Sequence, residues 1–199
     1  MYQKSSSQIA YSRRAGGRSW RARGFTLMEL LVVISIVAIL AGIGAPSFRN
    51  ITTSYRIAGE INGLLGDMRF ARAEAIKEGQ NVTICVSSDG LTCSNSTDWK
   101  SGWVVFPVVA TAPTAAQNAA SVLRIQAAFT SNDTFVDQTL GTKTVTFNRE
   151  GLISGLNGGA GALISLHDPT ARVSYTRCLQ ISSVGSLQVV QNATLGSCT

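Results

Sequence analysis

Histidine is almost absent from this 199-residue sequence, which has a single one, His167. It stands beside Asp168-Pro169, a neighbourhood more typical of a turn than of a catalytic site. The sequence also lacks a phosphate-binding glycine loop, and Ser154 in Gly-Leu-Ile-Ser-Gly does not fit the nucleophile elbow of hydrolases. We therefore expect a chain that is not an enzyme and that uses no cofactor.

Acidic residues are missing from the first 24 positions, although the whole chain has 11 of them. Six of the 17 basic residues lie in that stretch: Lys4, Arg13, Arg14, Arg18, Arg21 and Arg23. The other 11 basic residues equal the acidic ones in number, so the net charge of +6 does not indicate a nucleic-acid binder. Positive charge before an apolar segment keeps that end in the cytoplasm, so the rest should be exported, to the periplasm in a diderm bacterium.

The segment 25–45 contains 21 residues and a single charge, Glu29. A helix of this length measures about 31 Å at a rise of 1.5 Å per residue, which matches the hydrocarbon core of a bilayer. A secretory signal would instead have a shorter apolar region followed by its cleavage site. Here the candidate cleavage bond, Gly24–Phe25, precedes the apolar run, so cleavage would leave the membrane span on the mature protein.

The junction reads Gly24, Phe25, Thr26, Leu27 and Glu29, within an apolar run that ends at Pro46. This order resembles the class III leader and N-terminal helix of the type IV pilin and type II secretion pseudopilin superfamily. The resemblance implies that residues 1–24 are a leader, which a membrane peptidase removes after Gly24, and that the new N-terminal Phe25 is methylated. The alternative is an ordinary N-terminal anchor in which Gly-Phe-Thr-Leu occurs by chance.

Glu29 is a carboxylate inside a membrane-spanning segment. Such a charge costs about 2.5–3.5 kcal/mol at the helix centre, and less near an end, so it usually has a partner. After cleavage Glu29 would be the fifth residue, one helical turn from the new amino group of Phe25. The resemblance implies that the partner of Glu29 is the N-terminal amine of a neighbouring subunit in a filament. The alternative is that the Glu29 side chain reaches the lipid headgroups, which is also possible before assembly.

A helical pattern continues beyond Pro46, with apolar residues at steps of three and four: Ile51, Tyr55, Ala58, Ile61, Leu65 and Met68. Charged residues occupy much of the other faces, and Gly79 has the position of a C-cap. We predict one helix over 25–79, with 25–45 in the membrane, a kink near Pro46 and the second half packed on a head. Its glycines would serve either helix extension or close packing: Gly42, Gly44, Gly59, Gly63 and Gly66.

The four cysteines, Cys85, Cys93, Cys178 and Cys198, all follow the apolar segment. An even number of cysteines in an exported domain favours disulfides, and three connectivities are possible. We favour Cys85–Cys93 and Cys178–Cys198, because both pairs are local and the first closes over an Asp89-Gly90 turn. Neither pair has zinc-knuckle spacing, so no metal site is expected.

Residues 80–199 are predicted to form a β-rich head. Segments rich in β-branched and aromatic residues, separated by Gly, Asn, Asp or Ser, lie at 81–87, 102–109, 122–129, 142–148, 162–167, 173–182 and 186–190. The Ala/Thr-rich stretch 110–120 is expected to be an exposed loop. No second long helix is evident, which favours an antiparallel meander or two small sheets. The fold class is therefore α+β, a long N-terminal helix on an antiparallel head.

Several motifs of the predicted head resemble those of a smaller group within this superfamily. The segment 85–93, bounded by cysteines, is followed by Asp-Trp-Lys-Ser-Gly-Trp-Val-Val-Phe at 98–106, by Thr-Phe-Asn-Arg-Glu-Gly at 146–151 and by Arg177-Cys178. These motifs resemble the FimT and FimU group of minor pilins, relatives of the secretion pseudopilin GspH. We expect Trp99, Trp103 and Phe106 to be core residues.

Some FimT-like proteins are implicated in DNA uptake through a Gly-Arg-x-Arg segment near the C-terminus. This chain has Gly185-Ser186-Leu187-Gln188 at the comparable place, so both arginines are missing. Phosphate contacts dominate nucleic-acid affinity and need clustered Lys or Arg. DNA is therefore not an expected partner, and Arg172 and Arg177 are the candidates for a weak contact.

The resemblance implies a minor pilin or pseudopilin, and the apolar segment with its preceding positive charges predicts one pass through the bacterial inner membrane, a cytoplasmic N-terminus and a periplasmic head. Its partners would be a prepilin peptidase and methyltransferase, the inner-membrane assembly platform, and other pilins in a filament, with no small-molecule substrate. Within a type IV pilus it would prime assembly or link the tip complex, and so support motility or adhesion. The alternatives are a GspH-like subunit of type II secretion and a FimT-like DNA-binding protein for natural transformation.

Overall fold

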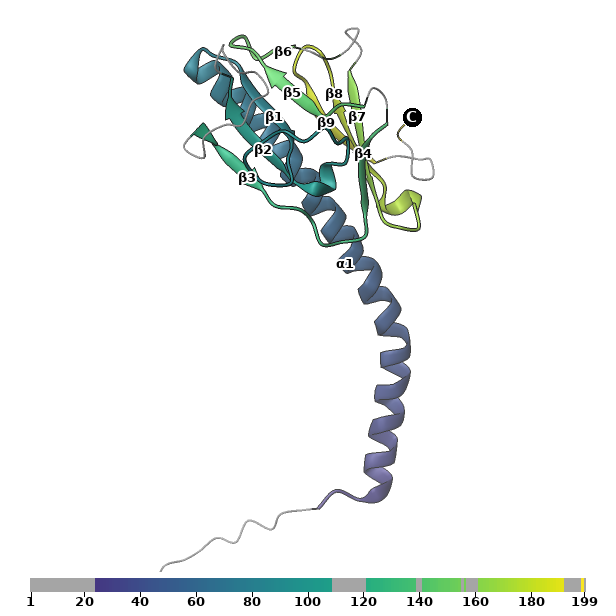
Figure 1. Ribbon diagram of the computed structural model, residues 1–199. Coiled ribbons are helices and arrows are strands. Elements are labelled where there is room, and N and C mark those ends of the chain that lie inside the picture. Colours follow the sequence, from purple (N-terminus) through teal and green to yellow (C-terminus); the bar gives the residue numbers. More distant parts are fainter. Residues whose placement is uncertain are drawn as a thin grey trace, which may run out of the picture. The chain divides into compact units, whose positions relative to one another are not determined.

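The computed structural model describes residues 24–108, 121–138, 141–154, 156, 161–191 and 198. The chain divides into two compact units, Met1–Gly44 and Ala45–Thr199. The second unit therefore contains the C-terminal part of the long helix together with the β-sheets of the head (Figure 1).

Helix α1 runs from Leu27 to Glu78. It ends as expected, because Gly79 has a φ of +64°, a left-handed conformation that glycine adopts without the steric penalty of a Cβ atom. The helix begins two residues later than predicted, at Leu27 rather than Phe25. The kink near Pro46 stays a prediction.

The head contains two antiparallel sheets, as one of the two predicted arrangements requires. The five-stranded sheet has the order β3-β2-β1-β5-β6, with β1 at Val82–Val86, β2 at Trp103–Pro107, β3 at Arg124–Gln126, β5 at Thr144–Phe147 and β6 at Ile153–Ser154. The four-stranded sheet has the order β4-β7-β8-β9, with β4 at Thr134–Asp137, β7 at Ala162–His167, β8 at Arg177–Ile181 and β9 at Leu187–Gln191. Two 3-10 turns, η1 at Trp99–Ser101 and η4 at Val173–Tyr175, precede β2 and β8.

Several strand predictions were inaccurate, and the strand predicted over 122–129 is limited to β3 at Arg124–Gln126. Strands β4 and β6 were missed because they have only four and two residues, too few to show an alternating pattern. The segment predicted as a strand over 173–182 begins instead as η4, and β8 starts at Arg177. The predicted loop 110–120 lies outside the described residues.

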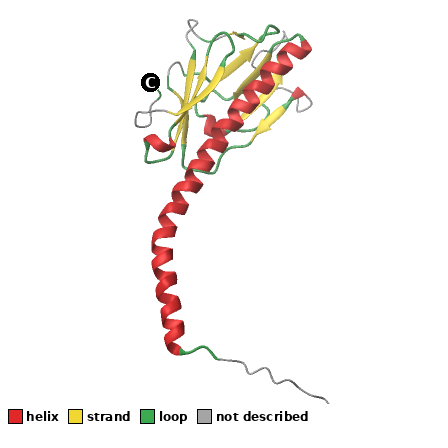
Figure 2. Cartoon of the chain, turned by 180° about the vertical axis from the view of Figure 1, so that it is seen from behind, coloured by secondary structure: helices red, strands yellow, loops and turns green. Residues whose placement is uncertain are grey.

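One face of α1 forms the centre of the core. Six fully buried residues on it recur at steps of three and four: Ile57, Ile61, Leu64, Met68, Ala71 and Ala75. The same core takes Ile84, Val105 and Phe147 from the five-stranded sheet, and Ile164, Leu166 and Leu179 from the four-stranded sheet. In Figure 2 this part of α1 crosses in front of strands from both sheets, and its buried residues belong to the same core as theirs.

The predicted apolar stripe was wrong at its start. Ile51 and Tyr55 are 51% and 75% exposed, although both fit a three-to-four spacing with Ile61. The fully buried stripe begins at Ile57, and the core that it joins is built from head strands, so the preceding turns are not covered by the described part of the head. Ile61 and Met68 were placed correctly, and Leu65 is 8% exposed.

The predicted core aromatics are buried. Trp99, Trp103 and Phe106 are all at most 1% exposed. The ring of Trp103 meets the ring of Phe135 edge to face, with 6.2 Å between centroids, a favourable geometry for aromatic pairs. The indole of Trp99 donates to the carbonyl of Thr142 at 3.2 Å, which satisfies its buried N–H.

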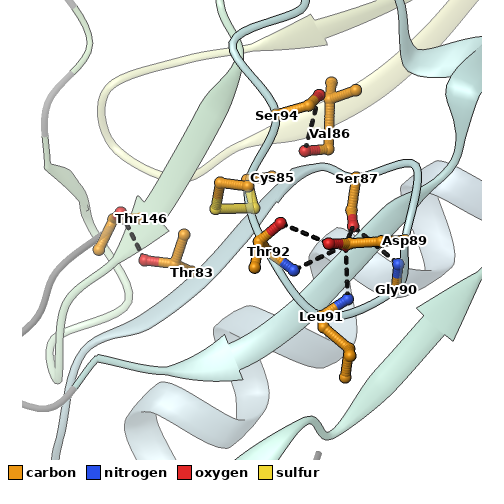
Figure 3. The surroundings of a disulfide bond; sticks show 11 residues. Thr83, Cys85, Val86, Ser87, Asp89, Gly90, Leu91, Thr92, Ser94 and Thr146 are labelled. Atoms are coloured by element: carbon orange, nitrogen blue, oxygen red, sulfur yellow. Dashed lines mark hydrogen bonds between the residues drawn. A yellow bond between two sulfur atoms is a disulfide. The ribbon is translucent and has the colours of Figure 1, made fainter. Parts of the chain in front are cut away.

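The structure pairs Cys85 with Cys93 and Cys178 with Cys198, the connectivity favoured from the sequence. The first disulfide closes the loop that follows β1 (Figure 3). The second attaches Cys198 to β8, an inner strand of its sheet, across a separation of 20 residues. Both therefore restrain chain ends or loops beside the core.

We expect the Cys178→Ala/Cys198→Ala double variant to lose about 3 kcal/mol of unfolding free energy, because a closed loop of that length restricts the unfolded chain. The Cys85→Ala/Cys93→Ala variant should lose about 2.5 kcal/mol, since its loop is shorter. Urea unfolding of the full chain in detergent measures both values. Unchanged midpoints would show that neither bond supports the head.

Candidate assembly segment and contacts of the head

The candidate cleavage bond lies outside the helix. Gly24 and Phe25 have no regular secondary structure, and α1 starts at Leu27. The side chain of Phe25 is on the surface, at 79% exposure for the residue. A peptidase that acts on Gly24–Phe25 would therefore not need to unwind α1.

Thr26 caps the N-terminus of α1. Its hydroxyl accepts a hydrogen bond from the amide of Glu29 at 3.2 Å, and its carbonyl accepts one from the amide of Leu30 at 3.1 Å. Thr26-Leu27-Met28-Glu29 thus has the sequence of a capping box, a local signal that the sequence analysis overlooked. Glu29 also lies in the first turn, where a negative charge is favoured by the helix dipole. Within the described residues its carboxylate makes no ion pair.

The first half of α1 has an apolar surface that is exposed among the residues that the structure describes. By length and composition α1 is long and apolar enough to cross a membrane, with a mean hydropathy of 2.6 in its most apolar window. None of that window is buried within the protein. This surface needs lipid or other apolar helices around it.

Arg56 and Glu60 attach the segment before β4 to the helix. The guanidinium of Arg56 donates two hydrogen bonds of 2.8 Å to Asp133, whose side chain is 1% exposed. One turn later, Glu60 accepts a hydrogen bond from the hydroxyl of Ser131 at 3.1 Å. Burial raises the pKa of Glu60, and the nearby charge of Asp133 raises it further, while the Ser131 bond lowers it.

Asp67 makes the next polar contact along α1. One carboxylate oxygen accepts from the indole of Trp103 at 2.8 Å, and the other accepts from Arg124 at 2.7 Å. The guanidinium of Arg124 also lies 3.9 Å from the centre of the Phe70 ring. Asp67 therefore connects the helix to β2 and β3, a role that its sequence neighbours do not indicate.

The two candidate DNA-contact residues bond to their own surroundings. Arg172 donates to the hydroxyl of Thr170 at 2.9 Å and lies 5.2 Å from the ring centre of Tyr175. Arg177 donates to the carbonyls of Ser174 and Thr176, both at 3.0 Å. Both arginines thus order the turn around η4, and a DNA contact by either of them stays a prediction.

Asp89 organises the loop closed by the Cys85–Cys93 disulfide (Figure 3). Its carboxylate accepts from the hydroxyl and amide of Thr92, the amide of Leu91 and the hydroxyl of Ser87. The two bonds from Thr92 contribute most to lowering the pKa of Asp89. These bonds to the ionised carboxylate therefore stabilise the fold at pH values above the usual aspartate pKa. The stabilisation is lost only as the pH falls through the lowered pKa of Asp89.

Residues 60–185 match the protein family described as type II transport protein GspH. The chain belongs to this family. Residues 21–45 of this GspH-family chain also match the prokaryotic N-terminal methylation motif. It is therefore a member of the type IV pilin and type II pseudopilin superfamily, whose members are structural subunits rather than enzymes.

The fold of this GspH-family chain is similar to that of the type IV minor pilin FimU of Pseudomonas aeruginosa. The TM-score is 0.53 at 19% identity, over 70% of this chain and 92% of the FimU structure. This likeness concerns the fold: a long helix packed on antiparallel sheets.

Curated relatives match over shorter lengths. The major fimbrial protein FimA of Dichelobacter nodosus is 33% identical over 76 residues, which are 38% of this chain and 47% of FimA, so the chain spans about half the length of that relative. The prepilin peptidase-dependent protein D of Escherichia coli is 60% identical over 30 residues, 15% of this chain and 20% of that protein. The type IV narrow pilus major component of Thermus thermophilus is 34% identical over 85 residues, 41% of this chain and 72% of that protein.

The methylation motif and the apolar first half of α1 are consistent with an inner-membrane location before assembly.

We predict that Glu60→Gln raises the melting temperature of the full chain in detergent at about pH 7.5. The raised pKa of Glu60 means that its protonated form stabilises the fold at low pH, and that this stability is lost as the pH rises through the raised value. Glutamine keeps an oxygen to accept from Ser131 and removes the charge near Asp133. The advantage over the wild type should therefore shrink as the pH is lowered toward about 4.5.

Glu150→Gln is the matched control, because its bond with Arg149 lowers the pKa of Glu150 instead of raising it. This variant should show no gain at neutral pH. If Glu60→Gln melted at a lower temperature than the wild type at both pH values, the result would contradict a raised pKa of Glu60.

Proposed function

We propose that this chain is a minor pilin of a type IV pilus, which primes assembly or links a tip complex to the major subunit. In this proposal the leader is removed after Gly24, Phe25 is methylated, and the subunit moves from the inner membrane into the filament. The observation that carries the proposal is the similarity of the chain to a fimbrial subunit and a narrow-pilus subunit. The FimU-like fold of the head agrees with it.

The proposal gives the apolar half of α1 two successive environments. Lipid covers the exposed side chains between Leu27 and Ile43 before assembly, and neighbouring helices cover them in the filament. In the filament the carboxylate of Glu29 pairs with the N-terminal amine of Phe25 of the next subunit. That pairing supplies the charged partner that the described residues of this chain do not supply.

A subunit of the type II secretion pseudopilus is the second candidate. It is favoured by the match of residues 60–185 to the family described as type II transport protein GspH. Processing, membrane location and helix packing would be the same in both systems, so the two candidates differ in the neighbouring subunits and in the process they support.

Deletion of the gene, with complementation by the full chain, separates the two candidates. The pilus proposal expects loss of twitching and of surface filaments with normal exoprotein secretion. It also expects the chain in filaments sheared from complemented cells. Loss of secretion with normal twitching would reject the pilus proposal in favour of the pseudopilus.

We predict that the mature chain begins with N-methylated Phe25. Intact-mass spectrometry of the purified protein measures this directly. Gly24→Val should leave the leader attached, because a branched side chain replaces the hydrogen atom beside the scissile bond. Gly42→Val serves as a control and should be cleaved normally, since it makes the same substitution within α1, away from the junction, where a Cβ atom meets no neighbouring atom. A wild-type chain starting upstream of Phe25 would disprove the processing step.

We also predict that Glu29→Leu is cleaved and inserted normally but is depleted from sheared filaments. Removing the carboxylate lowers the cost of placing the helix in lipid and removes the partner of the neighbouring amine. Glu74→Leu, outside the segment 25–45, should be incorporated like the wild type. Equal incorporation of Glu29→Leu and wild type would argue against the pairing.

A further inference from the structure

Two arginines of α1 border an open hollow on the head. Arg69 and Arg72 line it together with the turn between β8 and β9, from Val184 to Leu187, and its volume is about 390 Å³. Among the residues that the structure describes, neither arginine has a carboxylate partner. The hollow therefore presents positive charge without an internal counter-charge.

The guanidinium of Arg72 is held in place by two turns. Its Nη1 donates to the carbonyl of Gly185 at 2.8 Å. Gly151 and Gly185 both have positive φ values, +76° and +81°, and a Cβ atom at either position would lie 3.0 to 3.2 Å from the guanidinium. A Cβ atom at Gly185 would also lie 2.3 Å from the carbonyl oxygen of Gly151. The two glycines thus permit a close fit around Arg72, which fixes its position.

Among the described residues, Arg72 has one hydrogen-bond acceptor, the carbonyl of Gly185. Its Nε is buried and has no acceptor among the described residues, so only the Nη groups can reach an outside partner, and the carbonyl of Gly185 takes one of their N–H groups. A charged donor with few acceptors attracts an anion, and a guanidinium fits a carboxylate in a two-bond arrangement. Arg69, one turn earlier and exposed, adds a second positive charge to the same hollow.

Apolar side chains stand close to these arginines. Each of three segments contributes one exposed apolar side chain. These are Ile76 of α1 at 52% exposure, Leu152 of the β5–β6 turn at 44% and Val184 of the β8–β9 turn at 62%. The Cδ1 atom of Ile76 would lie 2.8 Å from a Cβ atom on Gly151, and the amide of Ile153 donates to the carbonyl of Ser183 at 3.1 Å. These contacts bring the three segments together beside Arg72.

We infer that this surface, Arg69, Arg72, Ile76, Leu152 and Val184, docks a carboxylate flanked by an apolar side chain on a neighbouring pilin subunit. The inference rests on the proposed assembly of this chain into a filament. Exposed apolar side chains beside a fixed guanidinium are typical of protein interfaces. Duplex DNA fits less well, because its affinity requires a longer row of cations than the two arginines of this hollow.

A photo-cross-linking residue in place of Val184 tests the inference in the full chain, expressed in piliated cells. Filaments are sheared, and the cross-linked peptide is identified by mass spectrometry. The expected product is a peptide of another pilin subunit, cross-linked within a few residues of Asp or Glu. Adding Arg69→Glu should lower its yield about fivefold or more, because a like charge then faces the carboxylate.

Lys143→Glu is the matched control. It makes the same charge change at the other end of β5, where Lys143 bonds to Asn95, and it should leave the yield unchanged. Arg69 is exposed and makes no contact that holds the described part of the fold, so Arg69→Glu should melt like the wild type. Replacing the identified partner carboxylate with arginine should restore cross-linking to the Arg69→Glu chain.

Equal cross-linking in the Arg69→Glu and Lys143→Glu chains would overturn the docking site, as would cross-links to DNA or only to proteins other than pilins. If the chain is present in sheared filaments but Arg69→Glu does not change the yield of the cross-link, the docking site is rejected and the proposed function is not. If a correctly processed chain is absent from filaments, the docking site fails together with the proposed function.

Discussion

The packing of α1 between Ile57 and Ala75 under the two sheets is the interaction on which the rest of the head depends. The two sheets share no strand, and the buried helix face packs against apolar residues of both of them in one core. Each large side chain buried there contributes about 1.5–3 kcal/mol relative to exposure in water. A helix that failed to cover this core would leave both sheets with an open apolar face.

Polar contacts determine which way α1 is turned on that core. Arg56, Asp67 and Arg72 each reach a different part of the head: the segment before β4, strands β2 and β3, and the β8–β9 turn. Because they occur along the length of the packed half, a rotation or one-residue slip of the helix would break all three sets of bonds. Apolar packing alone tolerates such shifts better than directional hydrogen bonds do.

The local features of the fold could be read from the sequence, and the long-range ones could not. The end of α1 at Gly79 and the cysteine pairing depend on residues close in sequence, whereas the sequence left two arrangements of the strands open, because β1 pairs with β5 and β4 with β7. The exposure of Ile51 and Tyr55 was mispredicted because periodicity identifies a face without showing where its cover begins. Asp133 and Gly185 lie 77 and 113 residues from their partners on α1, so no sequence pattern joins them. The capping box at Thr26 was a local signal and could have been found.

The position of that cap has a consequence for the order of events at the membrane. The cap belongs to the segment that follows the proposed cleavage bond, so the first turn keeps its own stabilising bonds whether or not residues 1–24 are attached. Cleavage would then leave the backbone of α1 as it is, and would convert a neutral amide nitrogen into an ammonium group. The maturation step would thus act as an electrostatic switch on a preformed helix, with no refolding needed before the subunit is ready.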